Sequence, residues 1–153
     1  MSHLEQLKAH KFFEGMDEGL LARLDACCTT KVSWEGEQLI FNEGQSADVC
    51  YLILEGDVSI EVHSPGGGVR TISTLHGGDV LGWSWMFPPY RWSFDARTMT
   101  STEALALDGS KLRDLKAGDH ELGYELMTRI SQVLINRLQA TRLQLLDLYE
   151  HGR

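Results

Sequence analysis

An arginine set among aromatic residues is the part of this sequence best suited to bind a ligand. Three of the four tryptophans, Trp83, Trp85 and Trp92, lie between Gly77 and Arg97, and Arg91 stands among them. A guanidinium can hold an anion through two parallel hydrogen bonds, with help from backbone N–H groups of a short loop. Aromatic side chains can enclose a planar ring. The segment therefore predicts a site for a small anionic ligand that carries a ring.

The same residue types also have a purely structural interpretation. Tryptophans in a loop can fill a hydrophobic core, and an arginine beside tyrosine or tryptophan can simply stack on its ring. Spacing alone leaves both interpretations open.

The other reactive side chains do not form a recognisable site. The six histidines are scattered, and none has a cysteine or carboxylate at metal-ligand spacing. The chain has three cysteines, Cys27, Cys28 and Cys50. An odd number does not indicate a disulfide framework, so we expect them to be reduced in a cytoplasmic protein. The sequence shows no nucleophile elbow, phosphate-binding loop or paired catalytic carboxylates. We therefore expect no enzyme, no metal and no cofactor.

Composition restricts the partners. The 153 residues suit a single domain, residues 1–153, and 42% hydrophobic residues are enough for a core. The net charge is −8, whereas proteins that bind duplex DNA carry a basic face. No apolar stretch is long enough for a membrane span, and the first residues lack the features of a signal peptide. We expect neither DNA nor a membrane as a partner.

The elements that position the aromatic segment form three blocks. Residues 1–28 predict short helices, the second of them capped by Asp17. Residues 29–108 change to a period of two with glycine-rich turns, which predicts a small β-sandwich or β-roll. Within this block, Glu55-Gly56-Asp57 predicts a hairpin turn.

Residues 109–150 return to helical residue types. A short helix is expected first, with Ser110 as its cap, and a long one of about 45 Å follows from Asp119. Residues spaced alternately by three and four form a heptad seam, the pattern of a two-helix coiled coil. The seam consists of Tyr124, Met127, Ser131, Leu134, Leu138, Thr141, Leu145 and Leu148. A second apolar set, expected to pack on the β-domain, consists of Leu122, Leu126, Ile130, Val133 and Ile135.

This helix predicts a homodimer, because its last turns extend beyond what the β-domain can cover. The alternative is that the whole helix packs back on its own domain.

Three stretches of the β-block resemble the cyclic-nucleotide-binding domain family, which includes catabolite-activator-type regulators. The resemblance covers about half of the chain and lies in residues 36–44, 51–58 and 75–82. It implies mainly β structure with flanking helices: a jelly-roll-like double-stranded β-helix, or β-roll, followed by a long dimerisation helix. It also implies a regulatory or sensor domain whose ligand is a cyclic nucleotide.

The phosphate-binding segment departs from the family pattern. The family has Glu directly after the glycine, where it holds the ribose hydroxyl, but here Trp83 follows Gly82. Tryptophan cannot accept that hydrogen bond, and its loss costs about 1.5–3 kcal/mol. The family's phosphate-binding Arg corresponds to Arg91 if one residue is deleted, and to Trp92 if none is. Weak or absent binding of cyclic AMP is therefore expected.

The resemblance assigns the candidate site residue by residue. Thr141 matches a threonine of the activator's dimer helix that contacts the base. The candidate ligand-binding residues are Gly82, Trp83, Ser84, Arg91, Trp92, Ser93 and Thr141, with Arg97 and Arg142 as secondary candidates.

Two functions stay open at this point. One is a sensor that binds a small molecule near this segment. The other is a ligand-independent module whose pocket is filled by its own tryptophans and which docks a protein. After the long helix only a few residues remain before Arg153, so we expect a stand-alone domain without a DNA-reading helix-turn-helix.

Overall fold

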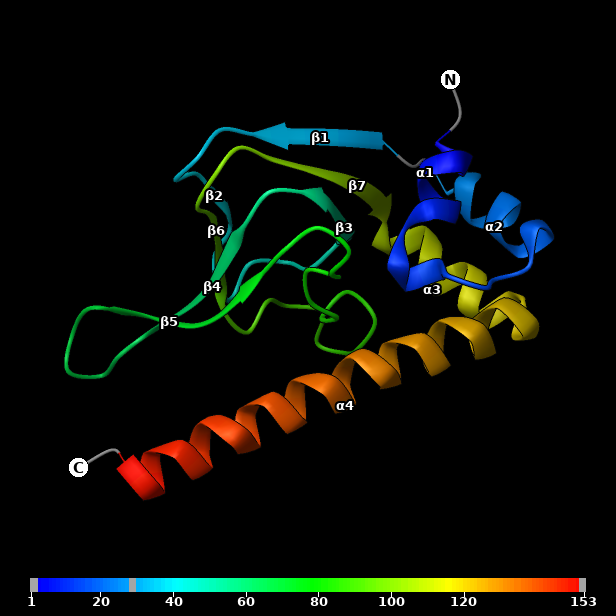
Figure 1. Cartoon of the computed structure of the whole chain (residues 1–153). Coiled ribbons are helices and arrows are strands. Elements are labelled where there is room, and N and C mark those ends of the chain that lie inside the picture. The colour runs from blue at the N-terminus through cyan, green and yellow to red at the C-terminus, as the bar shows by residue number, and fades with distance from the viewer. Residues whose placement is uncertain (1–2, 28–29, 152–153) are drawn as a thin grey trace.

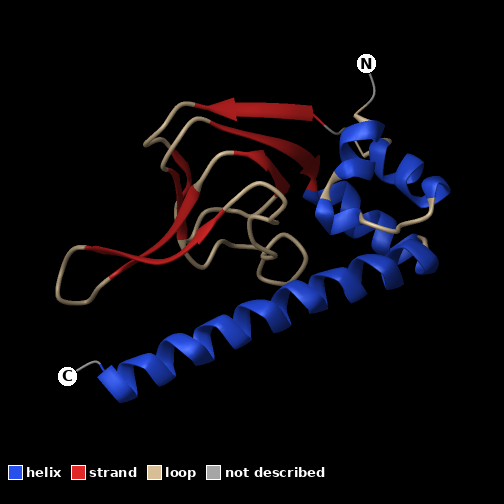
Figure 2. Ribbon diagram, in the orientation of Figure 1, coloured by secondary structure: helices blue, strands red, loops and turns tan. Residues whose placement is uncertain are grey.

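The computed structural model describes residues 3–27 and 30–151. Short helices at the N-terminus precede a β-roll, and two helices follow it (Figure 1). The helices are α1 (Leu4–Ala9), the 3-10 helix η1 (Lys11–Phe13), α2 (Glu18–Asp25), α3 (Gly109–Gly118) and α4 (His120–His151). The helices α1, α2 and α3 gather at one end of the strands, and α4 runs past them all (Figure 2).

All strand pairs in the two sheets are antiparallel. One sheet has the order β1-β7-β3 and the other the order β2-β6-β4-β5. The strands are β1 (Thr30–Trp34), β2 (Leu39–Phe41), β3 (Val49–Glu55), β4 (Val58–His63), β5 (Val69–Leu75), β6 (Asp95–Thr98) and β7 (Thr102–Asp108). Mainly antiparallel β structure with flanking helices and a long final helix confirms the predicted fold class.

The hairpin predicted at Glu55-Gly56-Asp57 is wrong. The strands before and after it, β3 and β4, lie in different sheets, so the chain turns a corner between sheets there. Gly56 has φ +104, and a Cβ on it would lie 2.5 Å from the carbonyl oxygen of Ser101. A glycine is needed at this corner for both reasons. A local turn signal does not tell which strand the next strand will pair with.

Strand β6 was not predicted, because Asp95-Ala96-Arg97-Thr98 contains a single apolar residue. It nevertheless lies between β2 and β4. Its polar side chains are satisfied locally: Asp95 accepts from the backbone N–H of Glu43 at 2.7 Å, and Thr98 donates to the carbonyl of Glu35 at 2.6 Å. Hydrogen bonding thus allows polar residues to be buried in a central strand.

The helix caps agree with the sequence in one case and differ in another. Asp17 caps α2 by accepting from Gly19 and Leu20, as predicted. The cap of α3 is Asp108, which accepts from the N–H of Lys111 at 3.0 Å, and not Ser110. With Asp108 as its cap, the helix begins two residues earlier than a Ser110 cap would require, so Ser110 lies within its first turn.

The buried residues of α4 lie in its first half, although hydrogen bonds to the roll continue as far as Gln144. Leu122, Leu126 and Ile130 are buried, and Val133 is partly buried in the same core. Ile135, which was predicted to belong to this packed set, is 48% exposed and so does not. The helix has 32 residues and a length of about 48 Å.

Most of the seam positions are exposed in the single chain, but Met127 and Leu134 are partly buried against the core of the domain. The exposed fractions are 72% for Tyr124, 51% for Leu138, 54% for Leu145 and 61% for Leu148. In the described residues, no helix is both long and apolar enough to span a membrane.

A buried histidine joins the N-terminal helices to the roll. The Nε2 of His10 lies 2.9 Å from the carbonyl oxygen of Ile53, and its Nδ1 accepts from the N–H of Phe12. The ring is therefore neutral, with its proton on Nε2. Burial lowers the pKa of His10, although the Ile53 carbonyl and Asp79 act in the opposite direction.

This arrangement predicts a pH dependence of stability. Because the pKa of His10 is lower in the folded chain than its usual value of about 6.5, protons bind the unfolded chain preferentially below that pH. The contribution of His10 to the free energy of unfolding should be complete above about pH 6.5 and decline as the pH falls toward the folded pKa. Thermal melts across this range should show a steeper acid-side loss for the wild type than for His10→Gln. Equal slopes would contradict the assignment.

Candidate functional site

The candidate site is built around Gly82, which has no room for a side chain. Its φ is +86, and a Cβ on it would lie 2.8 Å from the Cζ3 atom of Trp92 and 3.3 Å from the ring of Phe94. Such contacts are closer than carbon atoms normally approach, so the glycine lets the loop lie directly on the indole. Two residues ten positions apart in the sequence are thus in contact.

Trp92 lies inside the roll and is only 4% exposed. Its ring stacks on Phe41, with centroids 3.9 Å apart and planes 5° from parallel. Phe94 lies against both rings, at 5.8 Å from Phe41 and 6.5 Å from Trp92. Aromatic side chains of β2 and of the segment before β6 therefore occupy the space beneath Gly82.

Arg91 points the other way. It is exposed, and its Nη1 donates to the carbonyl of Gly44 at 2.8 Å. Backbone hydrogen bonds from Gly44 to Trp92 and from Trp92 to Gln45 hold this stretch extended against the neighbouring loop. Consecutive side chains of an extended chain lie on opposite faces, so burial of Trp92 turns Arg91 outward.

Trp83 is half-buried and contacts the long helix. The guanidinium carbon of Arg137 lies 5.6 Å from the centroid of its ring. Arg137 also donates through Nη2 to the carbonyl of Val80, at 3.1 Å. Burial lowers the pKa of Arg137, and the negative charge of Asp79 opposes this change. A cation from α4 is therefore fixed on the segment where the family pattern has a carboxylate.

A second arginine holds the same segment from α3. Arg113 donates to the carbonyl of Trp85 at 2.5 Å, and its guanidinium carbon lies 4.2 Å from the centroid of the Tyr90 ring. It also pairs with Asp48 at 3.7 Å. Arg113 and Arg137 were not among the site residues predicted from the sequence. The only available signal was that both are basic residues on helices that follow the roll.

The remaining candidates lie at the surface or in other contacts. Ser84 is partly buried, and Ser93 and Arg142 are exposed. The hydroxyl of exposed Thr141 donates to the carbonyl of Arg137 at 2.9 Å, one turn back in the helix. Arg97 pairs with Glu61 at 3.3 Å. The structure thus brings together Gly82, Trp83 and Trp92 and leaves Arg91, Ser93, Thr141 and Arg142 at the surface.

The histidines and cysteines occupy structural places. His76 and His63 pair with Asp57 and Asp95, at 2.6 Å and 2.9 Å. Cys27 and Cys50 are buried, and burial raises the pKa of the Cys50 thiol. Cys28 lies outside the described residues. Among residues 3–27 and 30–151, no three histidine, cysteine or acidic side chains gather as metal ligands.

Known proteins share this architecture. The family profile described as cyclic nucleotide-binding domain matches residues 31–119. The chain belongs to the cyclic nucleotide-binding domain family. The family resemblance read from the glycine-marked turns is thereby confirmed.

One relative of the domain is a transcriptional regulator. A CRP-like cAMP-activated global transcriptional regulator from Mycobacterium tuberculosis is 28% identical over 136 residues, which are 89% of this chain and 58% of that protein. The chain therefore spans less than two thirds of the relative. The last element in the described part of the chain is α4, so that part contains no helix-turn-helix.

Two solved structures show the shared fold. A candidate cyclic nucleotide-binding protein from Geobacter metallireducens has a TM-score of 0.79 at 25% identity, and the match covers 90% of this chain and 99% of that one. The catabolite activator protein of Thermus thermophilus has a TM-score of 0.70 at 22% identity, with coverage of 92% and 63%.

The contact of Arg137 with Trp83 should stabilise the domain. We expect Arg137→Met to lower the free energy of unfolding by about 1–2 kcal/mol, since it removes a cation–π contact and a hydrogen bond. Arg142→Met is the matched control, because Arg142 is exposed on the same helix, and it should have an effect near zero. Urea denaturation measures both. An equal loss in the two variants would show that the Trp83 contact adds nothing.

Proposed function

We propose that this domain is a homodimeric regulatory module whose β-roll is filled by its own aromatic side chains in place of a cyclic nucleotide. The observation that carries the proposal is the position of Trp92, buried beneath Gly82 and stacked on Phe41 at 3.9 Å. The roll interior is where the family resemblance places the ligand. An indole there takes the space and supplies no charge for a phosphate.

The charges around the segment support the same conclusion. The family's acidic residue after the glycine is replaced by Trp83, which stacks under Arg137 of α4. Arg91, the remaining cation of the segment, is directed outward to Gly44. A cyclic nucleotide in the roll would therefore meet neither its ribose acceptor nor its phosphate donor, and it would have to displace a stacked pair of rings.

A second candidate function is a cyclic AMP sensor. It is favoured by the 28% identity to a regulator that is described as cAMP-activated. In this case Trp92 would have to leave the roll when the nucleotide enters, and Arg91 would have to turn inward.

Thermal melts with cyclic AMP and cyclic GMP separate the two functions. A ligand present at 100 times its Kd raises the free energy of unfolding by about 2.7 kcal/mol, which increases Tm by several degrees. We expect no increase for the wild type at millimolar nucleotide. A dose-dependent increase would establish the sensor instead.

A second experiment restores the family residues and tests whether binding of the nucleotide returns. The double variant Trp83→Glu/Trp92→Arg places a carboxylate and a guanidinium at the two family positions and removes the indole from the roll. We expect this variant to gain stability from cyclic AMP in the same melts. Trp92→Phe, which keeps the ring and adds no charge, is the control and should gain nothing. Circular dichroism establishes that each variant is folded before its melt is interpreted.

The dimer part of the proposal rests on the exposed seam. Tyr124, Leu138, Leu145 and Leu148 expose half or more of their surface at the spacing of a coiled coil. Exposed apolar rows of this kind mark interaction surfaces. Leu126 and Ile130, on the side of α4 next to the seam, are packed on the domain, and the seam leucines nearer the end of the helix are left for a second copy.

A charged seam should give a monomer. We expect Leu138→Glu/Leu145→Glu to halve the mass measured by light scattering after gel filtration, because it places like charges against each other in the dimer. Leu143→Glu is a matched control, since Leu143 is 68% exposed on the same helix but outside the seam. A wild-type monomer, or an equal effect of the control, would exclude this interface.

The output of such a module would be a protein contact. The net charge of −8 does not favour contact with nucleic acid. The buried thiols of Cys27 and Cys50 fit a reducing compartment such as the cytoplasm.

A further inference from the structure

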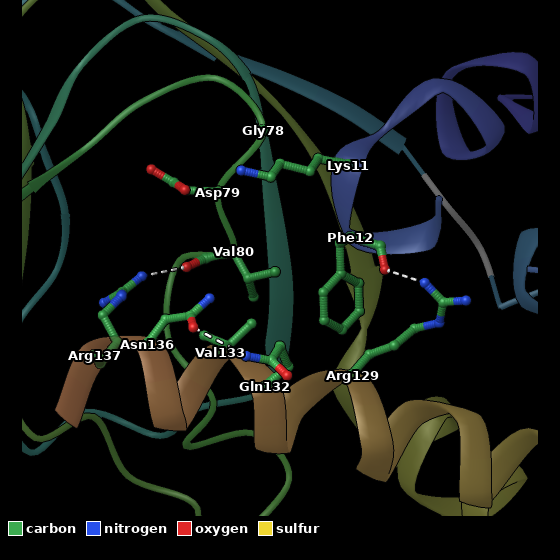
Figure 3. Close-up of a pocket in the computed structure, with 10 residues that line it drawn as sticks. All are labelled: Lys11, Phe12, Gly78, Asp79, Val80, Arg129, Gln132, Val133, Asn136 and Arg137. Carbon is green, nitrogen blue, oxygen red and sulfur yellow. Dashed lines mark hydrogen bonds between the residues drawn. The ribbon is translucent and has the colours of Figure 1, made fainter. Parts of the chain in front are cut away.

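A second cavity lies outside the roll, where α4 meets the N-terminal helices. It has a volume of about 250 Å³ and lies between η1, the loop at Gly78–Val80 and the middle of α4 (Figure 3). One water occupies roughly 30 Å³ in the liquid, so the cavity has room for a ligand of about six to eight non-hydrogen atoms. None of the α4 residues that line it belongs to the seam, so a seam dimer leaves it open.

One cation of the lining has a structural role. Arg129 donates to the carbonyls of Phe12 and Glu14, at 2.8 and 2.9 Å, and pairs with Glu125 at 3.3 Å. Its charge is balanced, and its donors hold η1 against α4. It therefore forms a wall of the cavity, and its charge does not add to the charge of the lining.

The other charges of the lining do not cancel. Arg137 uses one hydrogen bond, to Val80, and keeps further N–H groups. Lys11 extends over the cavity in Figure 3, and in the described part of the chain no carboxylate lies within 4 Å of its ammonium group. Asp79 is the one carboxylate in the lining. Two cations thus face one anion, which leaves a single positive charge in excess.

Neutral groups complete the lining. The side-chain oxygen of Asn136 accepts from Gln132 at 3.0 Å, which leaves the two N–H groups of the Asn136 amide as free donors. Phe12, Val80 and Val133 supply apolar surface beside these donors (Figure 3). A cavity with apolar walls and a few convergent polar groups is typical of a small-molecule site.

We propose that this cavity binds a small organic monoanion, a monocarboxylate with a short apolar body. The carboxylate would accept from Lys11, Asn136 and Arg137, and the body would lie on Phe12 and Val133. One negative charge balances the excess charge of the lining. The ligand would join α4 to the loop that leads to Gly82, where Arg137 already connects them. The proposal is independent of whether the roll holds a nucleotide, because the rings that fill the roll, Phe41, Trp92 and Phe94, do not line this cavity.

The test is a titration of the wild-type domain with hexanoate, followed by two-dimensional NMR of backbone and side-chain amides. We expect shifts of the Asn136 and Gln132 side-chain amides with a Kd on the order of 1 mM, as is usual for a ligand of about eight atoms. Hexanamide, which has no charge, should bind at least about tenfold more weakly, since it loses the charge-assisted hydrogen bonds. Hexylamine should not bind.

Two variants locate the site. Lys11→Met should weaken hexanoate binding about tenfold, by removing the cation that no described carboxylate pairs with. Arg70→Met removes an exposed cation of β5 and should leave the Kd unchanged. The proposal is overturned if hexanamide binds as well as hexanoate, if the two variants weaken binding equally, if the shifts map to Trp92 and Phe41, or if no shift occurs.

Discussion

The stack of Trp92 on Phe41 beneath Gly82 constrains the rest of this structure. The backbone around Trp92 is hydrogen-bonded to the loop that contains Gly44, so it is extended and its side chains alternate. Once the indole is buried, Arg91 has to lie on the outer face. The burial of one large ring adds on the order of 2–3 kcal/mol to the free energy of unfolding, and the stacking adds to this. An arginine at the surface keeps most of its hydration and therefore costs little. The energetic balance therefore favours a filled roll over one with an inward guanidinium.

The two helices after the roll, α3 and α4, contact the loop around Gly82. Arg113 of α3 reaches the carbonyl of Trp85, and Arg137 of α4 reaches Val80 and Trp83. Both arginines donate to backbone carbonyls and also lie over an aromatic ring, a combination that suits a planar guanidinium with five N–H donors. The helix that carries the exposed seam is thus fixed to the loop around Gly82 by direct contacts. The cavity near Lys11 lies at the same junction between α4 and this loop. The arginine contacts and the lining of the cavity therefore both involve the packing of α4 against the loop.

Much of the fold was predictable because its signals are local. Alternation identified most of the strands, and the glycines marked where the chain turns. The heptad spacing predicted a seam on α4, and most of its positions are exposed in the single chain. The wrong predictions fell where the structure depends on contacts between residues distant in the sequence. The corner at Gly56 looks like a hairpin until the pairing of β3 with β7 is known, and β6 has too few apolar residues to be recognised without its neighbours. Ser110 and Asp108 are both acceptable caps, and the start of the helix determined which one is used.

For the site, the sequence alone determined the residue types. Gly82 matches the glycine of the family pattern, Trp83 stands in place of the glutamate, and Arg91 or Trp92 stands at the position of the arginine. The sequence could not decide between Arg91 and Trp92 for the inner position, because a register difference of one residue exchanges the two faces of an extended chain. Tertiary structure decided it through the hydrogen bonds to the Gly44 loop and the space against Phe41. It also decided that Arg137 would meet Trp83, and that Lys11, Asn136 and Asp79 would surround one cavity. These residues are far apart in the chain, and only the packing of α4 across the domain brings them together.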